Sequence, residues 1–117
     1  MDLAKIIQTF KDHPDYHKIG MIASHLGVVR ENSLDGRKVR GIEIVFDRDM
    51  IDKIISETIE MQGIYQVMVE VSEGKLEVGD EIMAVVVGGD TREHVFPALI
   101  ETVNRIKVQG GRKKEIF

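Results

Sequence analysis

Hydrophobic residues along this chain follow two different spacings. Three segments carry apolar side chains three or four positions apart, which gathers them on one face of an α-helix. Four other segments alternate apolar and polar residues or are apolar throughout, which is typical of β-strands. These spacings predict helices over residues 2–12 and 48–62 and from Asp90 to Lys107, and strands over residues 18–30, 38–46, 64–72 and 81–87.

The order of these elements, α-β-β-α-β-β-α, predicts an α+β fold with a mainly antiparallel sheet and flanking helices. Residues 81–87 form an unbroken apolar run and should be a central strand, whereas the alternation over 64–72 indicates a half-buried strand. Residues 38–46 are the expected partner of strand 18–30, because Asp35-Gly36 between them suits the positive φ of a tight turn.

The bulk composition is that of a folded globular protein. A length of 117 residues predicts one domain, and 43% hydrophobic residues argue against disorder. The absence of cysteine excludes disulfides, thiolate metal sites and cysteine nucleophiles. No apolar run approaches the roughly 20 residues of a membrane span, and the N-terminus lacks the apolar core of a signal peptide. We therefore expect a cytoplasmic protein without membrane association.

Positive charge is concentrated near the C-terminus of an otherwise acidic chain. The formal net charge is -4, which argues against general nucleic-acid binding. Residues 105–117 nevertheless contain five of the 16 lysines and arginines. Lys107 closes a helix, two glycines follow, and a second group of cations comes next, so both groups can reach one anion. The alternative is a solvated basic tail over residues 108–117.

The four histidines are only weak evidence for a metal-binding site. His13 and His17 flank Asp15 in a turn that contains proline, and this arrangement is a poor ligand set. His25 in a strand and His94 in a helix are expected to be packed or solvated side chains. We predict neither a metal nor a cofactor.

Five short motifs occur in a fixed order along the chain. They are Gly27–Arg30 with the turn after it, Ile42-Glu43 with Met50 and Lys53 downstream, Gly74–Asp80, Thr91–Phe96, and Lys107 with Lys113–Glu115. Together they resemble the catalytic (large) subunits of molybdopterin synthase, the MoaE family, from Gly20 to Glu115. The resemblance implies a single α/β hammerhead domain over residues 1–117, with the basic tail at its C-terminal end.

The resemblance also implies a sulfurtransferase reaction in molybdenum cofactor biosynthesis. Enzymes of this family install two sulfurs on cyclic pyranopterin monophosphate and so make the dithiolene of molybdopterin. The sulfur arrives as a thiocarboxylate on the Gly-Gly C-terminus of a small ubiquitin-like sulfur-carrier subunit. Two large subunits form a homodimer with one small subunit at each outer end, a heterotetramer.

The same resemblance implies roles for the lysines. Lys107 is expected at the thiocarboxylate, and either Lys113 or Lys114 at the pterin. Counting seven positions from Lys107 selects Lys114, whereas anchoring on the sequence Lys-Lys-Glu selects Lys113, so both stay candidates. Fixed cations suit a reaction in which donor and substrate are anions and charge develops on oxygen.

Four further residues are expected to bind the substrate. The resemblance places Arg30 and Arg92 at its phosphate, and Thr91 and Arg112 complete the set. Arg92 lies in the first turn of a helix, where a cation opposes the helix dipole and is expected to serve another partner.

Three features depart from the family's pattern. Thr91 stands where the family has histidine, and Gly110-Gly111-Arg112 replaces a Pro-aromatic-Trp stretch, which removes a rigid wall and adds backbone freedom. The chain also ends two residues after Glu115, where relatives usually continue. The alternative is therefore a divergent, non-catalytic homologue that acts as a dimeric partner-binding module. A third reading is an unrelated anion-binding domain.

Overall fold

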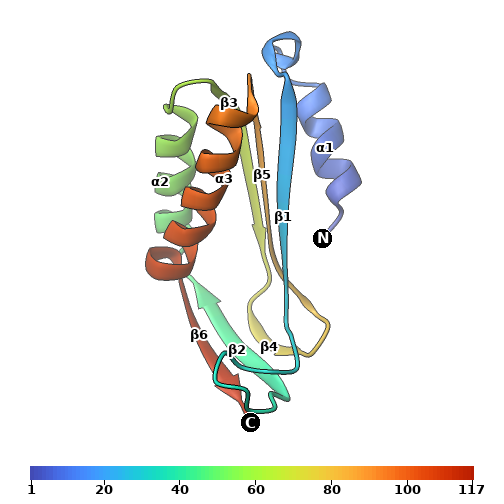
Figure 1. The fold of residues 1–117 in the computed structure, drawn as a ribbon, viewed down its shortest axis with the longest axis vertical. Helices are drawn as coiled ribbons and strands as arrows, with labels where there is room; N and C mark the ends of the chain where they lie inside the picture. The colour runs from blue at the N-terminus through green and yellow to red at the C-terminus, as the bar shows by residue number, and fades with distance from the viewer.

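The computed structural model describes residues 1–117 as two three-stranded antiparallel sheets placed end to end, with three α-helices packed on the first sheet (Figure 1). The molecule is elongated, with extents of 47 × 25 × 24 Å. The predicted α+β class with antiparallel pairing is confirmed. None of the helices is both long enough and apolar enough to cross a membrane.

The helices and strands lie close to the predicted segments, with two strands that were not predicted. The helices are α1 (Leu3–Lys11), α2 (Arg48–Ile59) and α3 (Arg92–Arg105), with a 3-10 turn η1 (Tyr16–Lys18) and a π-helical turn η2 (Ile106–Gly110). The strands are β1 (Met21–Val28), β2 (Gly41–Phe46), β3 (Ile64–Val71), β4 (Gly74–Glu77), β5 (Glu81–Gly89) and β6 (Gly111–Ile116). Strands β4 and β6 are the additions.

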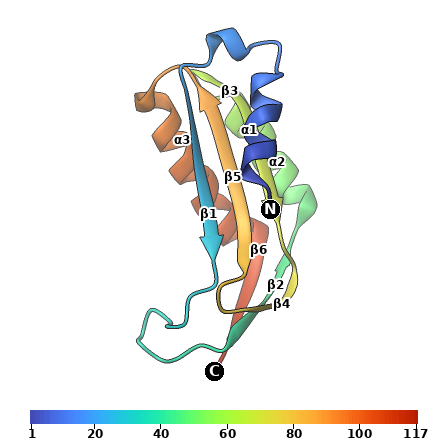
Figure 2. The same cartoon turned by 90° about the vertical axis from the view of Figure 1, so that its right-hand side faces the viewer.

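The first sheet has the order β1-β5-β3, so the apolar run of β5 is central, as predicted. Helices α2 and α3 cover one face of this sheet and α1 covers the other (Figures 1 and 2). Val85 packs with Ile54 and Val95 on the first face, while its neighbour Val86 packs with Phe10 on the second. Because both faces are covered, β5 is apolar at consecutive positions instead of alternating.

The predicted pairing of strand 38–46 with strand 18–30 is wrong. Strand β1 pairs with β5, whereas β2 lies in the second sheet, which has the order β4-β2-β6. Ile42 and Ile44 of β2 pack with Val29 in a small separate core, and this burial draws β2 away from the first sheet.

The turn that suggested the pairing does form, but it closes only a small loop. Gly36 adopts a φ of 87°, the positive value expected for it. The loop is closed by the backbone amide of Gly36, which donates to the carbonyl of Ser33, and by a single bridge between Asn32 and Lys38. The turn motif therefore fixed local geometry and left the partner of β2 undetermined.

Most of the expected basic tail is a strand rather than a free segment. Strand β6 pairs with β2 from Gly111, opposite Phe46, to Ile116, opposite Gly41. It forms the edge of the second sheet, and lysines are common on edge strands because they discourage pairing with other chains. Its three consecutive cations hide the alternation by which a strand is usually detected.

Candidate functional site

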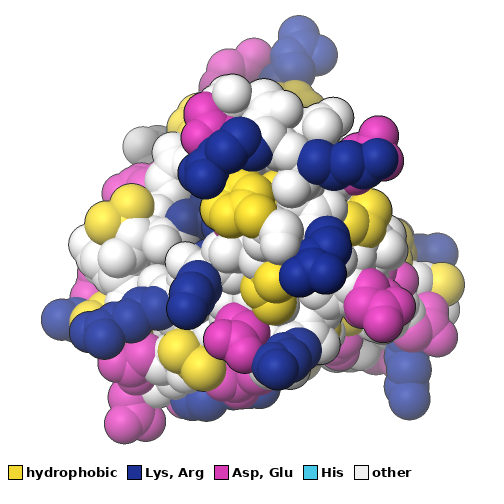
Figure 3. All heavy atoms as spheres, turned by 90° about the horizontal axis from the view of Figure 1, so that it is seen from below, with side chains coloured by type: hydrophobic (Ala, Val, Ile, Leu, Met, Phe, Trp, Pro, Cys, Tyr) yellow, Lys and Arg dark blue, Asp and Glu magenta, His cyan; other side chains and the backbone are white.

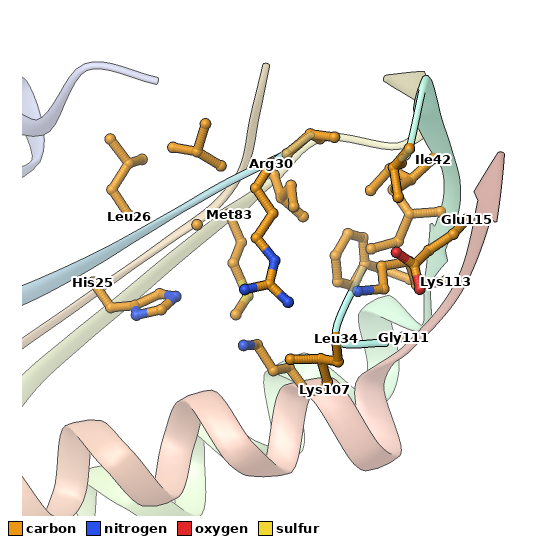
Figure 4. A pocket seen from close by; sticks show the side chains of 17 residues that line it. His25, Leu26, Arg30, Leu34, Ile42, Met83, Lys107, Gly111, Lys113 and Glu115 are labelled. Atoms are coloured by element: carbon orange, nitrogen blue, oxygen red, sulfur yellow. The ribbon is translucent and has the colours of Figure 1, made fainter. Parts of the chain in front are cut away.

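A cavity of about 650 Å³ lies where the end of β1 meets the second sheet and the C-terminal end of α3 (Figure 4). Ten of its 17 lining residues are hydrophobic. The cavity is partly open to solvent, so a ligand that covers its apolar wall would displace water and strengthen electrostatic interactions there. Its charged or titratable lining residues are His25, Arg30, Lys107, Lys113 and Glu115.

Lys107 is positioned by the π-helical turn η2, which continues α3 into β6. Its neighbour Ile106 is fully buried in the main core and anchors the turn. Gly110, at the end of the turn, is also buried, and an added Cβ there would meet Ile51 at 3.4 Å. A π-helical turn is wider than an α-turn and is frequent at functional sites. Here it presents Lys107 to the cavity from a turn whose first and last residues, Ile106 and Gly110, are buried.

Lys113 and Lys114 lie on opposite faces of the second sheet, because successive side chains of a strand alternate. Lys113 is paired across the sheet with Ile44, and both line the cavity. Lys114 is paired with Glu43, and both line a shallow groove together with Arg112, at a place on the sheet where Lys113 also reaches the groove. Of the two candidate lysines, only Lys113 therefore shares the cavity with Lys107.

Arg30 enters the cavity from the segment that follows β1. Val29 before it is buried, and its backbone amide donates to the carbonyl of Asp80 at 2.9 Å. Its carbonyl in turn accepts from the amide of Gly79 at 2.8 Å. These two bonds hold the segment, and Figure 4 shows the Arg30 guanidinium directed toward Lys107.

The cations of the cavity have no ionic partners in the chain. Arg30, Lys107 and Lys113 take part in none of the nine ion pairs, although Glu115 lines the same cavity. Seen from this end of the molecule, lysine and arginine side chains surround exposed hydrophobic ones (Figure 3). Uncompensated positive charge beside apolar walls suits an anionic ligand with a flat or aliphatic part.

Thr91 and Arg92 do not reach this cavity. They lie at the N-terminal end of α3, and about fifteen residues at 1.5 Å each place Arg92 roughly 20 Å from Lys107. Arg92 is exposed, and its Nε lies 3.5 Å from a carboxylate oxygen of Glu93. Within one chain, the structure separates these two residues from Arg30, and Arg112 lines the shallow groove instead of the cavity. Of the four residues predicted to bind the substrate, only Arg30 lines the cavity.

His25 is a lining residue that the sequence analysis missed. Its Nε2 atom is buried and has no hydrogen-bond partner. Burial, and then the positive charge of Lys107, lower the pKa of His25 from its ordinary value. The alternation of side chains along the strand could have revealed it. His25 lies two residues from the buried Ala23 and two from Gly27, which lines the cavity, so all three share one face of β1. A titratable residue on the covered face of a strand warrants a functional hypothesis.

The glycines at 110 and 111 allow close packing of neighbouring side chains, rather than the added backbone freedom that was expected. A Cβ on Gly111 would lie 2.9 Å from two ring carbons of Phe46, so only glycine allows this close approach. Phe46 itself lines the cavity. The apolar wall expected to be lost with the Pro-aromatic-Trp stretch is thus supplied in part by β2.

Comparison with known proteins identifies related sequences and folds. The protein-family model described as MoaE protein matches residues 1–109. No significant match was found among curated proteins. Molybdopterin cofactor biosynthesis protein E from Burkholderia multivorans is 25% identical, with a TM-score of 0.79 over 98% of this chain and 80% of that protein.

Two further solved structures share the fold at lower identity. The molybdopterin synthase from Staphylococcus aureus has a TM-score of 0.72 at 20% identity, over 90% of this chain and 85% of that one. A complex of subunits 1 and 2 of the molybdopterin-converting factor from Helicobacter pylori has a TM-score of 0.72 at 14% identity, over 100% and 84%.

Proposed function

Because this chain belongs to the MoaE family, we propose that it is the large subunit of a molybdopterin synthase in molybdenum cofactor biosynthesis. In this proposal it transfers sulfur from the thiocarboxylate of a small subunit to cyclic pyranopterin monophosphate. The observation that carries the proposal is the convergence of three cations without ionic partners, Arg30, Lys107 and Lys113, on one mostly apolar cavity. The apolar part of that lining suits a flat pterin ring, and its three cations suit the phosphate and the thiocarboxylate.

Each of the three cations has its own role in this proposal, according to its position in the cavity. Lys107, on the π-helical turn, neutralises the thiocarboxylate and the oxyanion that forms on its carbonyl. Lys113, on the opposite wall, binds the pterin, and Arg30 holds the phosphate through a bidentate guanidinium contact. Donors fixed in place before the reaction stabilise developing charge without reorganisation, which is the main source of catalysis in such sites.

Arg92 can bind the same substrate only from a second copy of the chain, since roughly 20 Å of helix separates it from Lys107 in its own chain. A homodimer is supported by the apolar surface left uncovered. Residues 83–87 of β5 are buried within the chain and offer no surface to a second copy. Val28 on the edge strand β1 and Ile100 on α3 are instead 48% and 61% exposed.

We therefore expect the protein to be a homodimer in solution. Light scattering at micromolar concentration should give twice the mass of one chain. Ile100→Asp, which places a charge on the exposed face of α3, should shift the equilibrium toward monomer without lowering the helix content. A monomeric wild-type protein at this concentration would contradict the prediction and leave Arg92 without a route to the cavity.

The small subunit should bind through its extended C-terminal tail. A Gly-Gly terminus is thin enough to enter the cavity, and its negative end faces Lys107. Removal of the two glycines should weaken binding about tenfold or more, since hydrogen bonds to charged groups contribute about 1.5–3 kcal/mol each. Titration calorimetry with full-length and truncated small subunit measures the difference. Equal affinities would place the interface elsewhere.

Incubation with thiocarboxylated small subunit and cyclic pyranopterin monophosphate tests the function itself. The dithiolene should form, and mass spectrometry of the pterin reports the yield. The alternative, a non-catalytic partner-binding module, predicts a dimer that binds the tail but makes no product. The departure at Thr91 motivates this alternative, and only turnover separates it from a catalyst.

A further inference from the structure

We propose that His25 is a catalytic base of this cavity, which takes the proton from the water that hydrolyses the acyl–sulfur bond between the partner's tail and the pterin. This inference rests on the proposed sulfur transfer. His25 lies on β1 beside Lys107 and Arg30, and Figure 4 shows its ring directed into the space that they share.

The unpartnered Nε2 atom is the first observation behind this role. Buried polar atoms in folded proteins almost always have a hydrogen-bond partner, and exceptions often mark catalytic positions. Nε2 of His25 is buried and has none within the chain. In the neutral tautomer that carries hydrogen on Nδ1, the lone pair of Nε2 is available to accept a proton.

The surroundings keep the imidazole neutral. The charged groups that face the cavity are Lys107 from η2, Arg30 from the segment after β1, and Lys113 and Glu115 from β6. Strand β5 adds only Ile82 and Met83, and α3 adds no lining residue. Three cations against one carboxylate disfavour an imidazolium, in agreement with the lowered pKa of His25, whose causes are burial first and Lys107 second. The residue is therefore unprotonated at neutral pH and able to act as a base.

Sulfur transfer from an acyl thiocarboxylate requires such a base. When the sulfur attacks a side-chain carbon of the pterin, the bond from that carbon to an oxygen of the cyclic phosphate breaks, and its electron pair leaves on the phosphate oxygen. The partner's tail is then joined to the pterin as a thioester. Water oxygen then attacks the carbonyl carbon and passes one proton to Nε2 of His25. The acyl carbon–sulfur bond breaks, its electron pair stays on sulfur as a thiolate, and the tail leaves as a carboxylic acid that loses its proton to solvent. Lys107 stabilises the oxyanion of the intermediate.

The test compares wild type with His25→Gln and His25→Phe in a single turnover. Loss of a general base costs about 100- to 10,000-fold, so release of the tail should slow by at least 100-fold. The thioester-linked adduct of small subunit and pterin should accumulate in both variants and be visible by intact mass spectrometry. The matched control is His17→Gln, since His17 is an exposed histidine in η1 at the other end of the molecule.

The pH profile separates a base from a packing residue. The wild-type rate of tail release should fall as pH drops through the pKa of His25, below its ordinary value of about 6.5, because the protonated ring cannot accept a proton. His25→Gln should lack this inflection, and imidazole added to His25→Gly should restore part of the rate.

Several outcomes would overturn the inference. Tail release at the wild-type rate in His25→Gln would do so, as would loss of product without any adduct. If the variants do not fold, NMR titration of wild type and Lys107→Ala replaces them. The pKa of His25 should rise when Lys107 is removed. An unchanged pKa would show that Lys107 does not act on the His25 ring and would contradict the inference. Absence of both adduct and product with wild type would instead refute the proposed function.

Discussion

Replacing Lys107 with alanine should lower the rate of sulfur transfer about 100- to 1000-fold while leaving the fold nearly intact. Lys107 is exposed and has no ion pair, so its removal costs little beyond the helix-dipole contribution of about 0.3–1 kcal/mol. That is a small part of a typical stability of roughly 5–15 kcal/mol. The buried anchor of the turn is Ile106, which the substitution does not touch.

Single-turnover dithiolene formation measures the predicted loss of rate, and thermal unfolding measures the predicted retention of stability. Lys107→Arg should rescue the rate poorly, because the planar guanidinium keeps the charge but differs from an ammonium group in shape and hydrogen-bond geometry. Gln109→Ala, on the same exposed turn, is the matched control and should retain the wild-type rate. Retention of most of the rate by Lys107→Ala would show that the proposed site is wrong.

Two neighbouring lysines should respond very differently to the same substitution. Lys113→Ala should slow the reaction about 100-fold, since Lys113 shares the cavity with Lys107. Lys114→Ala should change the rate by only a few fold, because its side chain lies on the opposite face of the second sheet, beside Glu43. The two variants remove the same charge from the same strand, so each controls for the other. The reverse order of effects would mean that the register of β6 differs from the one described.

Much of the fold could be predicted from local patterns. Helix α2 and the strands β3 and β5 follow from apolar spacing, because each packs against the main core along its whole length. The pairing of β2 could not be predicted in the same way. The partner of β2 is determined by the burial of Ile42 and Ile44 against Val29. The sequence of the turn carries no information about this tertiary contact.

The candidate site was only partly visible in the sequence. Lys107 and Arg30 stand out as cations at the ends of regular elements, and both line the cavity. The choice between Lys113 and Lys114 needed the register of an edge strand whose sequence is polar throughout its middle. His25 was missed because its importance comes from the closeness of Lys107, which lies 82 positions later in the chain.

The distance between Arg92 and the cavity has a similar origin. In the sequence Arg92 belongs with Arg30 as an unexplained cation, yet the length of α3 keeps them apart in one chain. Spacing along a chain says nothing about contacts between chains. This part of the proposed site therefore depends on the homodimer.

The central claim is that this chain transfers sulfur, and the most direct measurement follows that sulfur. The small subunit should be prepared with a heavy-isotope thiocarboxylate and incubated with wild-type protein and cyclic pyranopterin monophosphate. Mass spectrometry of the pterin should then find two sulfur atoms per molecule, both of them heavy, with the small subunit returned as a carboxylate. A pterin that carries no heavy sulfur, in the presence of a small subunit that binds, would contradict the account and favour the partner-binding module.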